Sequence, residues 1–364
     1  MKVEILIYAY LAICAAMIAF NIVCIFVFRK KERDIARRSI DFTKIVLQQL
    51  ELDAVEEAHK DFLRKKLRKI NHMMAFDETL EELYAQRPRD VQRYIGELSS
   101  VFVYLSFHYS QKDRIQAAYF PYIIDKYKVF AGNGMDVVTD SMMELVKEQD
   151  LYCRENALQA LYTIGDTDSV VEALKTVNRN GNFHHTKMIT DGLLSFTGDR
   201  EDLDSALWQC YEDFSLNLKL AVLEYFCLGR DGHGEKLLPI MLDREERQEL
   251  RLSAIGYFAR HRYEPAFLQL CQMAGETALD WEYRAAVATA LGNYPSEETK
   301  YQLKDMLHDE NWYVRYNAAE SLDRLGVRYE ELVDIFEGPD RDAAEMLRYR
   351  FDRKQLTEKE GTPI

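Results

Sequence analysis

The chain has 364 residues, with 47 basic against 61 acidic side chains and a formal net charge of −14 at pH 7. A chain this acidic is repelled by phosphodiester backbones, so its charge argues against nucleic acid as a partner. Only 7 Pro and 16 Gly interrupt it, and no runs of alternating Val and Ile occur, so the composition predicts an all-α fold.

An apolar segment begins the chain, because residues 3–28 carry no charge after Glu4. At about 1.5 Å per residue, a helix of this length crosses a hydrocarbon layer about 30 Å thick with some tilt. Aromatic side chains suited to the two interfaces lie near its ends: Tyr8, Tyr10, Phe26 and Phe28. A cleaved signal peptide would have a shorter apolar region and a small-residue cleavage site. Residues 1–30 are therefore predicted to be a retained transmembrane anchor.

Basic side chains follow the apolar segment directly: Arg29, Lys30, Lys31, Arg33, Arg37 and Arg38. By the positive-inside rule they stay in the cytoplasm. The chain is therefore expected in the cell (inner) membrane as a single-pass protein, with its N-terminus outside and its repeats in the cytoplasm. These side chains are predicted to contact anionic lipid headgroups, each contributing about 1 kcal/mol.

Residues 31–110 are predicted to form a basic juxtamembrane helical segment, in which residues 32–53 continue the membrane helix. Residues 29–69 have a net charge of +5, which leaves −19 for residues 70–364. A second basic run, at residues 60–69, fits two interpretations, contact with lipid headgroups and a solvated helix face. Residues 91–109 and 111–127 are predicted to be two further apolar helices.

A pattern with a period of 31–33 residues follows, anchored on a recurring basic residue: Arg154, Lys187, Lys219, Arg251, Arg284 and Arg315. Apolar residues three, four and seven positions after each anchor share one helical face, and the best copies close with Gly165 and Gly326. A second apolar helix fits in the rest of each period, as at residues 264–274 and 297–307. Such a period predicts stacked helical hairpins, because one hairpin alone cannot bury its apolar face.

Two of these copies, at residues 148–166 and 309–326, resemble the HEAT-repeat family in its short bacterial form, the PBS-lyase HEAT-like repeats. The likeness is carried in the better copy by Asp309, Val314, Arg315, Ala318, Ala319, Leu322 and Gly326. It is carried in the other by Asp150, Arg154, Ala157, Ala160, Leu161 and Gly165. The resemblance implies an α-solenoid over residues 111–328, whose concave side, lined by the helices with the Val-Arg element, binds partner proteins. Lys stands at 187 and 219, so a continuous ladder of Asp and Arg is not expected.

Residues 329–364 are predicted to cap the solenoid. Two shorter helices with a more polar face are expected within residues 329–354, as a terminal repeat requires. The last nine residues, 356–364, are predicted to be disordered.

The sequence offers no catalytic, cofactor-binding or metal-binding constellation, and the protein is predicted not to be an enzyme. Its six Cys form no C-x-x-C pair. Four of them are expected to be small core residues: Cys153, Cys210, Cys227 and Cys271. His184 and His185 lack the H-E-x-x-H spacing and are predicted to lie on a loop or on the concave face. The glycine-rich residues 229–236 lack the spacing of a phosphate-binding loop and are predicted to be an inter-helix turn.

Aromatic residues recur where the anchor helices begin. Trp281 and Trp312 each stand three positions before an anchor Arg, so stacked repeats would set them side by side. Aromatic side chains supply many interface hot spots, whereas in a chain with 22 Tyr they also serve as packing. The candidate partner-binding residues are Tyr152, Trp281, Trp312, Tyr313 and Tyr316.

These features favour a membrane-anchored scaffold or adaptor that binds a protein partner at the cytoplasmic face. The architecture, and no single residue, suggests a subunit of a membrane enzyme complex such as a polysaccharide-synthesising glycosyltransferase. One alternative is a bilin lyase-like enzyme, which the PBS-lyase name implies and which the anchor and the lack of a reactive Cys motif disfavour. The other is a structural spacer whose anchor self-associates.

Overall fold

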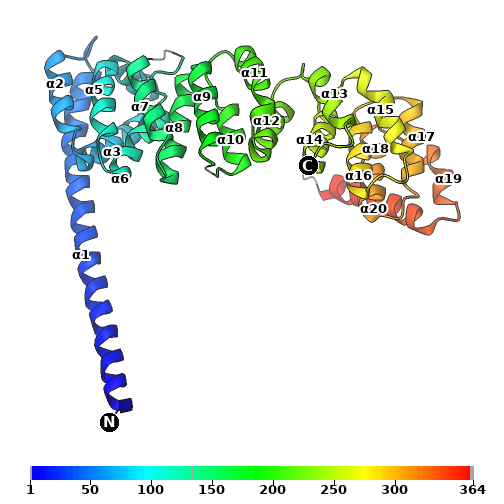
Figure 1. Cartoon of the computed structure of the whole chain (residues 1–364), viewed down its shortest axis with the longest axis horizontal. Coiled ribbons are helices and arrows are strands. Elements are labelled where there is room, and N and C mark those ends of the chain that lie inside the picture. The colour runs from blue at the N-terminus through cyan, green and yellow to red at the C-terminus, as the bar shows by residue number, and fades with distance from the viewer. Residues whose placement is uncertain (1, 133–134, 182, 361–364) are drawn as a thin grey trace. The chain divides into compact units, whose positions relative to one another are not determined.

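The structure is a computed structural model, and it describes residues 2–132, 135–181 and 183–360. Throughout these residues every regular element is a helix, as Figure 1 shows. The all-α fold predicted from the composition is therefore confirmed. The helices form two compact units. Unit 1 comprises residues 1–182 and 195–206, and unit 2 comprises residues 183–194 and 207–364.

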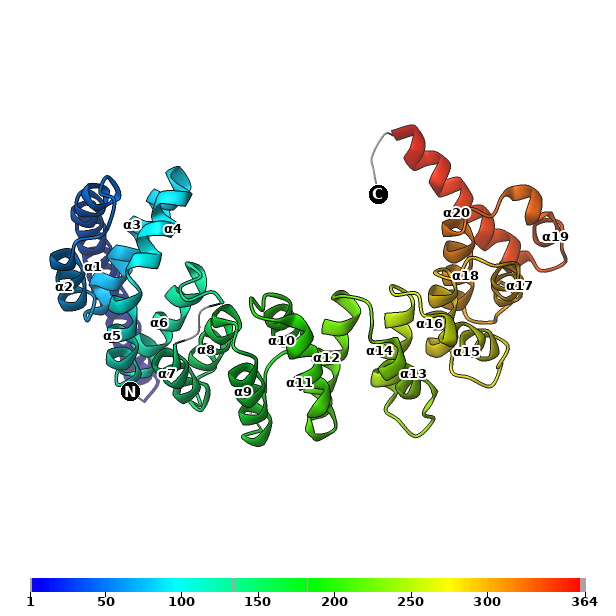
Figure 2. The same cartoon turned by 90° about the horizontal axis from the view of Figure 1, so that it is seen from above.

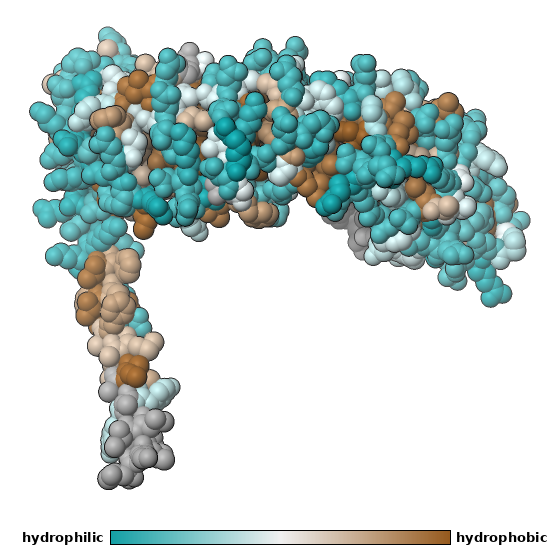
Figure 3. All heavy atoms as spheres, in the orientation of Figure 1, coloured by the Kyte–Doolittle hydropathy of each residue, from teal (hydrophilic) through white to brown (hydrophobic). Residues whose placement is uncertain are grey.

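The first helix, α1 (Lys2–Leu50), runs without a break for 49 residues, because no Gly or Pro interrupts it. Among the described residues it is the one helix long and apolar enough to cross a membrane. Its described side chains are exposed or half-buried up to Asp34, and Ile35 is the first to be buried. Apolar side chains gather on this exposed part, whereas the surface of the rest of unit 1 is mostly polar (Figure 3). The predicted continuation of the helix beyond residue 32 is confirmed up to Leu50.

Unit 1 continues with eight helices in two layers, and the second half of α1 packs on α3. They are α2 (Glu57–Lys66), α3 (Ile70–Gln86), α4 (Pro88–Glu97), α5 (Ser99–Ser110), α6 (Arg114–Lys126), α7 (Asp136–Val146), α8 (Leu151–Ile164) and α9 (Thr167–Arg179). The helices α5, α7 and α9 pack in succession on one side, and α6 packs along α8 on the other. The predicted domain boundaries at residues 30, 110 and 328 remain predictions.

Unit 2 has a first layer of helices that hold the anchor residues: α10 (Thr186–Leu194), α12 (Leu216–Leu228), α14 (Gln248–Phe258), α16 (Trp281–Leu291) and α18 (Trp312–Arg324), followed by α20 (Arg341–Glu360). Its second layer is α13 (Gly234–Leu242), α15 (Glu264–Ala274), α17 (Glu297–Met306) and α19 (Val333–Phe336). Within unit 2 the first layer lies on the concave side (Figure 2). The hairpins predicted from the period are confirmed, and α11 (Arg200–Gln209) has residues in both units.

Three of the four anchor Arg residues, Arg154, Arg284 and Arg315, donate hydrogen bonds to the turn that precedes their own helix. The Nη1 atom of Arg154 donates to the carbonyl oxygens of Glu148 and Gln149 at 2.9 and 2.6 Å. Arg315 repeats this arrangement, with its Nη1 atom 2.7 and 3.0 Å from the carbonyl oxygens of Asp309 and Glu310. Turn carbonyls beside a helix N-terminus have no intrahelical partner, so a buried guanidinium supplies the missing donors.

A second set of side chains joins the C-terminal ends of neighbouring helices, and the sequence pattern did not predict it. In unit 2, His261 Nε2 lies 2.9 Å from the carbonyl oxygen of Cys227, and Asn293 Nδ2 donates to that of Phe258 at 3.2 Å. In unit 1, Thr197 Oγ1 donates to the carbonyl oxygen of Thr163 at 2.6 Å. Each bond satisfies a terminal carbonyl that the helix leaves without a partner.

Two expectations for the C-terminal region are wrong. The second of the two predicted short helices, α20, is 20 residues long and extends to Glu360, so residues 356–360 are helical instead of disordered. The end of the predicted tail, residues 361–364, lies outside the described residues. The helix continues because residues 341–360 contain no Gly or Pro and are rich in helix formers.

Candidate functional site

Four aromatic side chains at the starts of α16 and α18 form one continuous stack, which we call the aromatic cluster: Trp281, Tyr313, Trp312 and Tyr316. The rings of Trp281 and Tyr313 stack with centroids 5.3 Å apart and planes 24° apart. Tyr313 meets Trp312 edge to face at 5.2 Å and 88°. Trp312 in turn stacks on Tyr316 at 5.0 Å and 17°. Tyr313 therefore lies between the two Trp rings, which corrects the prediction that the Trp residues are direct neighbours.

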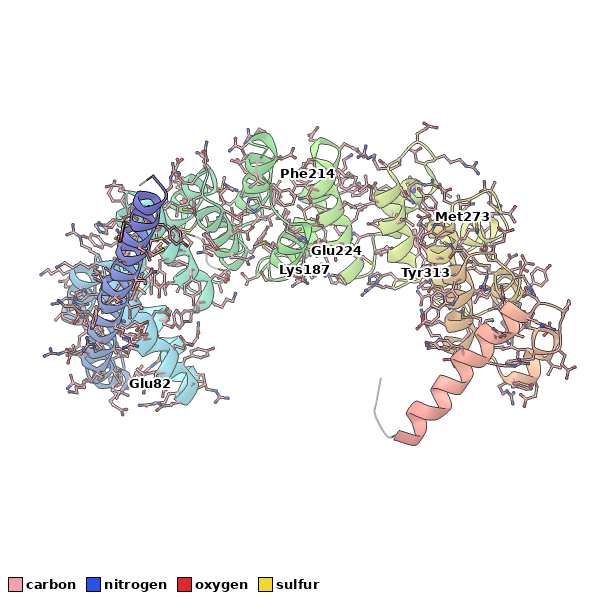
Figure 4. The ribbon with its side chains drawn as sticks, turned by 90° about the horizontal axis from the view of Figure 1, so that it is seen from below. Glu82, Lys187, Phe214, Glu224, Met273 and Tyr313 are labelled. Carbon is pink, nitrogen blue, oxygen red and sulfur yellow. The ribbon has the colours of Figure 1, made fainter. Side chains whose placement is uncertain are left out.

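Local helix geometry explains half of this arrangement. Trp312 and Tyr316 are four residues apart, so they lie on the same face of α18. The side chain of Asn311 caps α18 by accepting a hydrogen bond from the backbone N–H of Tyr313 at 2.8 Å. This cap sets where the helix begins and therefore which ring turns toward α16. Figure 4 shows Tyr313 on the concave side of unit 2.

The cluster is ordered and open to solvent at once. Trp281 is 39%, Trp312 48% and Tyr313 56% exposed. Tyr283, on the same turn as Trp281, is instead buried beneath the guanidinium of Arg251, whose Cζ atom lies 4.4 Å from the ring centroid. Rings that already hold each other in place lose little side-chain entropy on binding a partner. They also offer large amphipathic faces, which is why Trp and Tyr are common at interfaces.

An open groove of about 480 Å³ adjoins the cluster, lined by Trp312, Arg315, Asp342, Glu345, Met346 and Tyr349. Two carboxylates and one guanidinium give it a net negative lining. The Nε atom of Arg315 is buried without a hydrogen-bond partner, and its Nη2 atom lies 3.8 Å from Asp342. A guanidinium N–H can only donate, so the groove retains an unused donor for a carbonyl or carboxylate oxygen.

Sequence reasoning missed the α20 side of this groove, because residues 341–354 were assigned to a short capping helix. A signal was present, since Asp342, Met346 and Tyr349 are spaced by four and three residues and so share a helix face. Only the packing of α20 on α18 brings that face beside Trp312.

The remaining predicted site residues lie elsewhere. Tyr152 is 76% exposed at the start of α8 in unit 1 and makes no ring contact among the described side chains, so the structure does not bring it into the cluster. The predicted basic residues from Arg29 to Arg37 are exposed on α1, and Arg38 is half-buried. Arg33 Nε donates to the carbonyl oxygen of Arg29 at 3.2 Å, which leaves most of the charge free for other contacts.

The cysteine environments are those of packing residues. Cys153 and Cys271 are buried, and burial raises the pKa of each thiol to about 11. A thiol with so high a pKa is a poor nucleophile. Cys210 is also buried, whereas Cys227 is half-buried, so three of the four match the expectation of core residues. No group of His, Cys, Asp or Glu in the described part of the chain is placed to hold a metal ion.

Two expectations on loops meet different outcomes. His184 and His185 both lie in the loop before α10, as predicted, although His184 is buried with 1% of its surface exposed. Its carbonyl oxygen accepts a hydrogen bond from Asn217 at 2.6 Å. The predicted turn at residues 229–236 is confirmed for residues 229–233, which join α12 to α13, whereas residues 234–236 are the first residues of α13.

Comparison with known proteins agrees with the repeat architecture. A family model of HEAT repeats matches residues 234–323 and 267–349, which include the aromatic cluster and the groove. No curated protein matches the chain. Among solved structures 13 chains match, including human deoxyhypusine hydroxylase, solved in complex with glycerol. That protein is 17% identical, with a TM-score of 0.28, and the match covers 82% of this chain and 97% of that one.

Proposed function

We propose that this HEAT-repeat protein is a membrane-anchored scaffold that binds a protein partner through the aromatic cluster and the adjoining groove. The observation that carries the proposal is the ordered stack of Trp281, Tyr313 and Trp312, each between 39% and 56% exposed. HEAT repeats generally mediate contacts between proteins, and central aromatic anchors contribute most of the binding free energy of such contacts. The proposed role is binding, without catalysis.

The acidic and aromatic side chains that line the groove support a basic partner segment. Asp342 and Glu345 attract Lys or Arg side chains, and the faces of Trp312 and Tyr349 attract the same cations through their π electrons. The unused N–H of Arg315 matches a backbone carbonyl oxygen. We therefore propose a basic segment with one or more apolar side chains as the bound element.

The exposed apolar part of α1 supports a membrane anchor, and the exposed basic residues that follow it support the repeats at the cytoplasmic face. Anchoring confines the scaffold to the membrane plane and raises its effective concentration near membrane-bound partners. A membrane enzyme complex, such as a polysaccharide-synthesising glycosyltransferase, is accordingly the class of partner that we propose. Protease treatment of sealed vesicles of known orientation tests the topology, since the repeats should be cut only where the cytoplasmic face is outside.

Site-specific photocrosslinking of the full-length protein in native membranes tests the partner site. A photoreactive amino acid at position 313 should capture a distinct protein, and the same group at position 301 should not. Tyr301 is the matched control because it is 67% exposed on α17, in the second layer of the same unit. Combined Trp281→Ala and Trp312→Ala substitutions should abolish capture from position 313.

Capture of the same proteins from both positions, or of none from position 313, would contradict the proposal. Capture of the chain itself would favour the self-associating spacer instead. That alternative makes its own prediction, because crosslinked homo-oligomers should then survive removal of residues 70–364.

A further inference from the structure

Three helices of unit 1 enclose a small pocket where α1 enters the body of the unit, which we call the basic pocket. Its volume is about 180 Å³. α1 contributes Arg38, Asp41, Phe42 and Ile45, α2 contributes Phe62 and Lys66, and α3 contributes His72. The site is distinct from the aromatic cluster, which belongs to unit 2.

Two buried polar atoms in this pocket have no hydrogen-bond partner. They are the Nη1 atom of Arg38 and the Nδ1 atom of His72. Buried polar groups are nearly always paired, and each exception asks for an explanation. An Arg nitrogen can only donate, and the imidazole donates from Nδ1 in one of its two neutral tautomers. Both atoms therefore suit an incoming group that carries several acceptor oxygens.

The basic side chains around the pocket outnumber the acidic ones. Burial lowers the pKa of His72, and the nearby charges of Arg38, Lys66 and Lys69 lower it further. Asp41 is the one acidic residue in the lining. On the same α2 helix, Lys60 and Arg64 are neutralised by Glu57 and Asp61 at 2.8 and 2.6 Å. Among the described residues neither Arg38, Lys66 nor Lys69 forms an ion pair, so these three charges are available to an anion.

The lining of the pocket is also aromatic. The ring of Phe42 lies edge-on to those of His72 and Phe62, with centroids 6.4 and 6.2 Å apart. The Lys66 Nζ atom lies 5.7 Å from the centre of the Phe62 ring. A ligand that combines an anion with adjacent hydrocarbon would contact both the basic and the aromatic side chains, whereas a purely inorganic ion would contact only the basic ones.

The pocket lies at the end of unit 1 from which the exposed part of α1 emerges. Gln49, at the far end of α1, bonds Glu56 before α2, so α2 runs back along α1 toward this end. Arg38 is the pocket residue of α1 nearest the exposed part, and it follows Phe28, the last residue of the uncharged apolar segment, by ten positions. Ten residues of helix rise about 15 Å. A long side chain on a helix points back toward the helix N-terminus, which here is toward a headgroup layer of about 5–8 Å on each side of the hydrocarbon.

We propose that the basic pocket binds a phosphate group, supplied by the headgroup of an anionic phospholipid. Arg38 Nη1 and His72 Nδ1–H donate to the phosphate oxygens, and Lys66 supplies a further positive charge. Phe42 and Phe62 cover the glycerol carbons. Free inorganic phosphate offers the same acceptor oxygens. The choice of a lipid as the source depends on the proposed membrane anchor, whereas the phosphate chemistry of the pocket does not.

Native mass spectrometry of the full-length protein in a non-ionic detergent tests the proposal. Three probes are added separately: dioctanoyl phosphatidylglycerol, dioctanoyl phosphatidylcholine and inorganic phosphate. One phosphatidylglycerol should be retained per chain, and phosphatidylcholine should bind more weakly because its choline group meets a positive lining. Arg38→Gln should weaken phosphatidylglycerol binding about tenfold, since it removes a charge-assisted hydrogen bond.

Arg37→Gln is the matched control, because Arg37 carries the same charge one position away and is exposed. Lys66→Gln, at an exposed position, repeats the test in case Arg38→Gln impairs folding, which circular dichroism reports. Binding lost equally in the Arg37 and Arg38 variants, or equal retention of the two lipids, would overturn the proposal. Inorganic phosphate that displaces phosphatidylglycerol at equal concentration would support the phosphate site and overturn the lipid as its source. None of these measurements depends on the aromatic cluster.

Discussion

Arg284 donates two parallel hydrogen bonds to the carboxylate of Asp309 in the following repeat. Its Nε atom lies 2.6 Å from Oδ2 and its Nη2 atom 3.1 Å from Oδ1. The two side chains are only 16% and 12% exposed. This pair ties the first turn of α16 to the turn before α18, and so holds the two helices that present the aromatic cluster. The hydrogen bond with Asp309 raises the pKa of Arg284 further above its usual value.

Replacing Asp309 with Asn should lower the free energy of unfolding of unit 2 by about 2 kcal/mol, because it leaves a largely buried guanidinium without its counter-charge. The chain provides an exposed control pair in Arg244 and Glu276, in which the Nη2 atom of Arg244 donates to both carboxylate oxygens at 2.8 and 3.1 Å. That Arg is 74% exposed, so Glu276→Gln should cost less than about 0.5 kcal/mol. Urea titrations followed by circular dichroism compare the two, and equal losses would contradict the importance of burial.

Gly165 closes α8 with a φ of +80°, and a Cβ atom there would lie 2.7 Å from Thr197 Oγ1 and 2.8 Å from the Gly198 nitrogen. Gly165→Ala should therefore destabilise unit 1 by clash as well as by backbone strain, in all by more than about 2 kcal/mol. Gly326, with a φ of +72° and nothing within 4 Å of such a Cβ, isolates the strain. Gly326→Ala should cost about 1 kcal/mol. Thermal melting of both variants checks the difference, which should vanish if the close approach to Gly198 is unimportant.

Acidification should destabilise unit 1 through His59, which is buried and whose Nε2 atom lies 2.7 Å from the hydroxyl of Tyr94. Burial lowers the pKa of His59 below its usual value of 6.5, against a smaller opposing effect of Glu56. The unfolded chain therefore binds a proton at a higher pH than the folded chain does. The contribution of neutral His59 to the stability of unit 1 is therefore fully present above pH 6.5. It is lost as the pH falls toward the lowered pKa of the folded state.

His59→Gln keeps a polar partner for Tyr94 and removes the titrating group. The melting temperature of the variant should consequently fall less between pH 7 and pH 5 than that of the unmodified protein. Burial also lowers the pKa of His72 and of His108, so a residual slope of the same sign should remain. A variant with an unchanged slope would assign the acid sensitivity to other groups.

The exposure of the aromatic cluster predicts that its loss affects binding more than folding. Trp312→Ala removes a ring that is 48% exposed, so it should cost roughly 1 kcal/mol of stability. Tyr283→Ala removes a ring that is only 6% exposed and should cost about 3 kcal/mol or more. Melting curves of the two variants, measured beside partner capture, make the comparison. Equal losses of stability would mean that Trp312 is part of the core instead of a contact surface.

Much of the architecture follows from local patterns. Apolar residues at helical spacing predicted α15 and α17 within one residue of their observed bounds. The membrane helix was likewise expected to continue over residues 32–53, and it does so as far as Leu50. The length of α20 was underestimated, because a polar face was interpreted as a sign of short capping helices, whereas helix propensity alone carries residues 341–360.

The candidate site was predicted in part. The Trp, Tyr and Arg residues of the repeats marked the correct turns, but the order of the rings did not follow from their columns. Asn311 caps α18 and turns Tyr313 toward Trp281, and this depends on how two helices 31 positions apart in the chain pack together. Tyr152 occupies the same repeat position as Tyr313 and has no ring partner among the described side chains, because its neighbours differ.

By itself the sequence determined the helices, their repeat and the division of charge between the two ends. Periodicity and helix propensity act over a few residues, and net charge is a sum that does not depend on how the chain folds. Only the tertiary structure decided that Tyr313 separates two Trp rings, that α20 completes a groove and that Arg38 and His72 share a pocket. Those arrangements depend on the angle and rotation of helices packed against one another. Contacts between residues distant in the chain set these angles, and no local pattern encodes them.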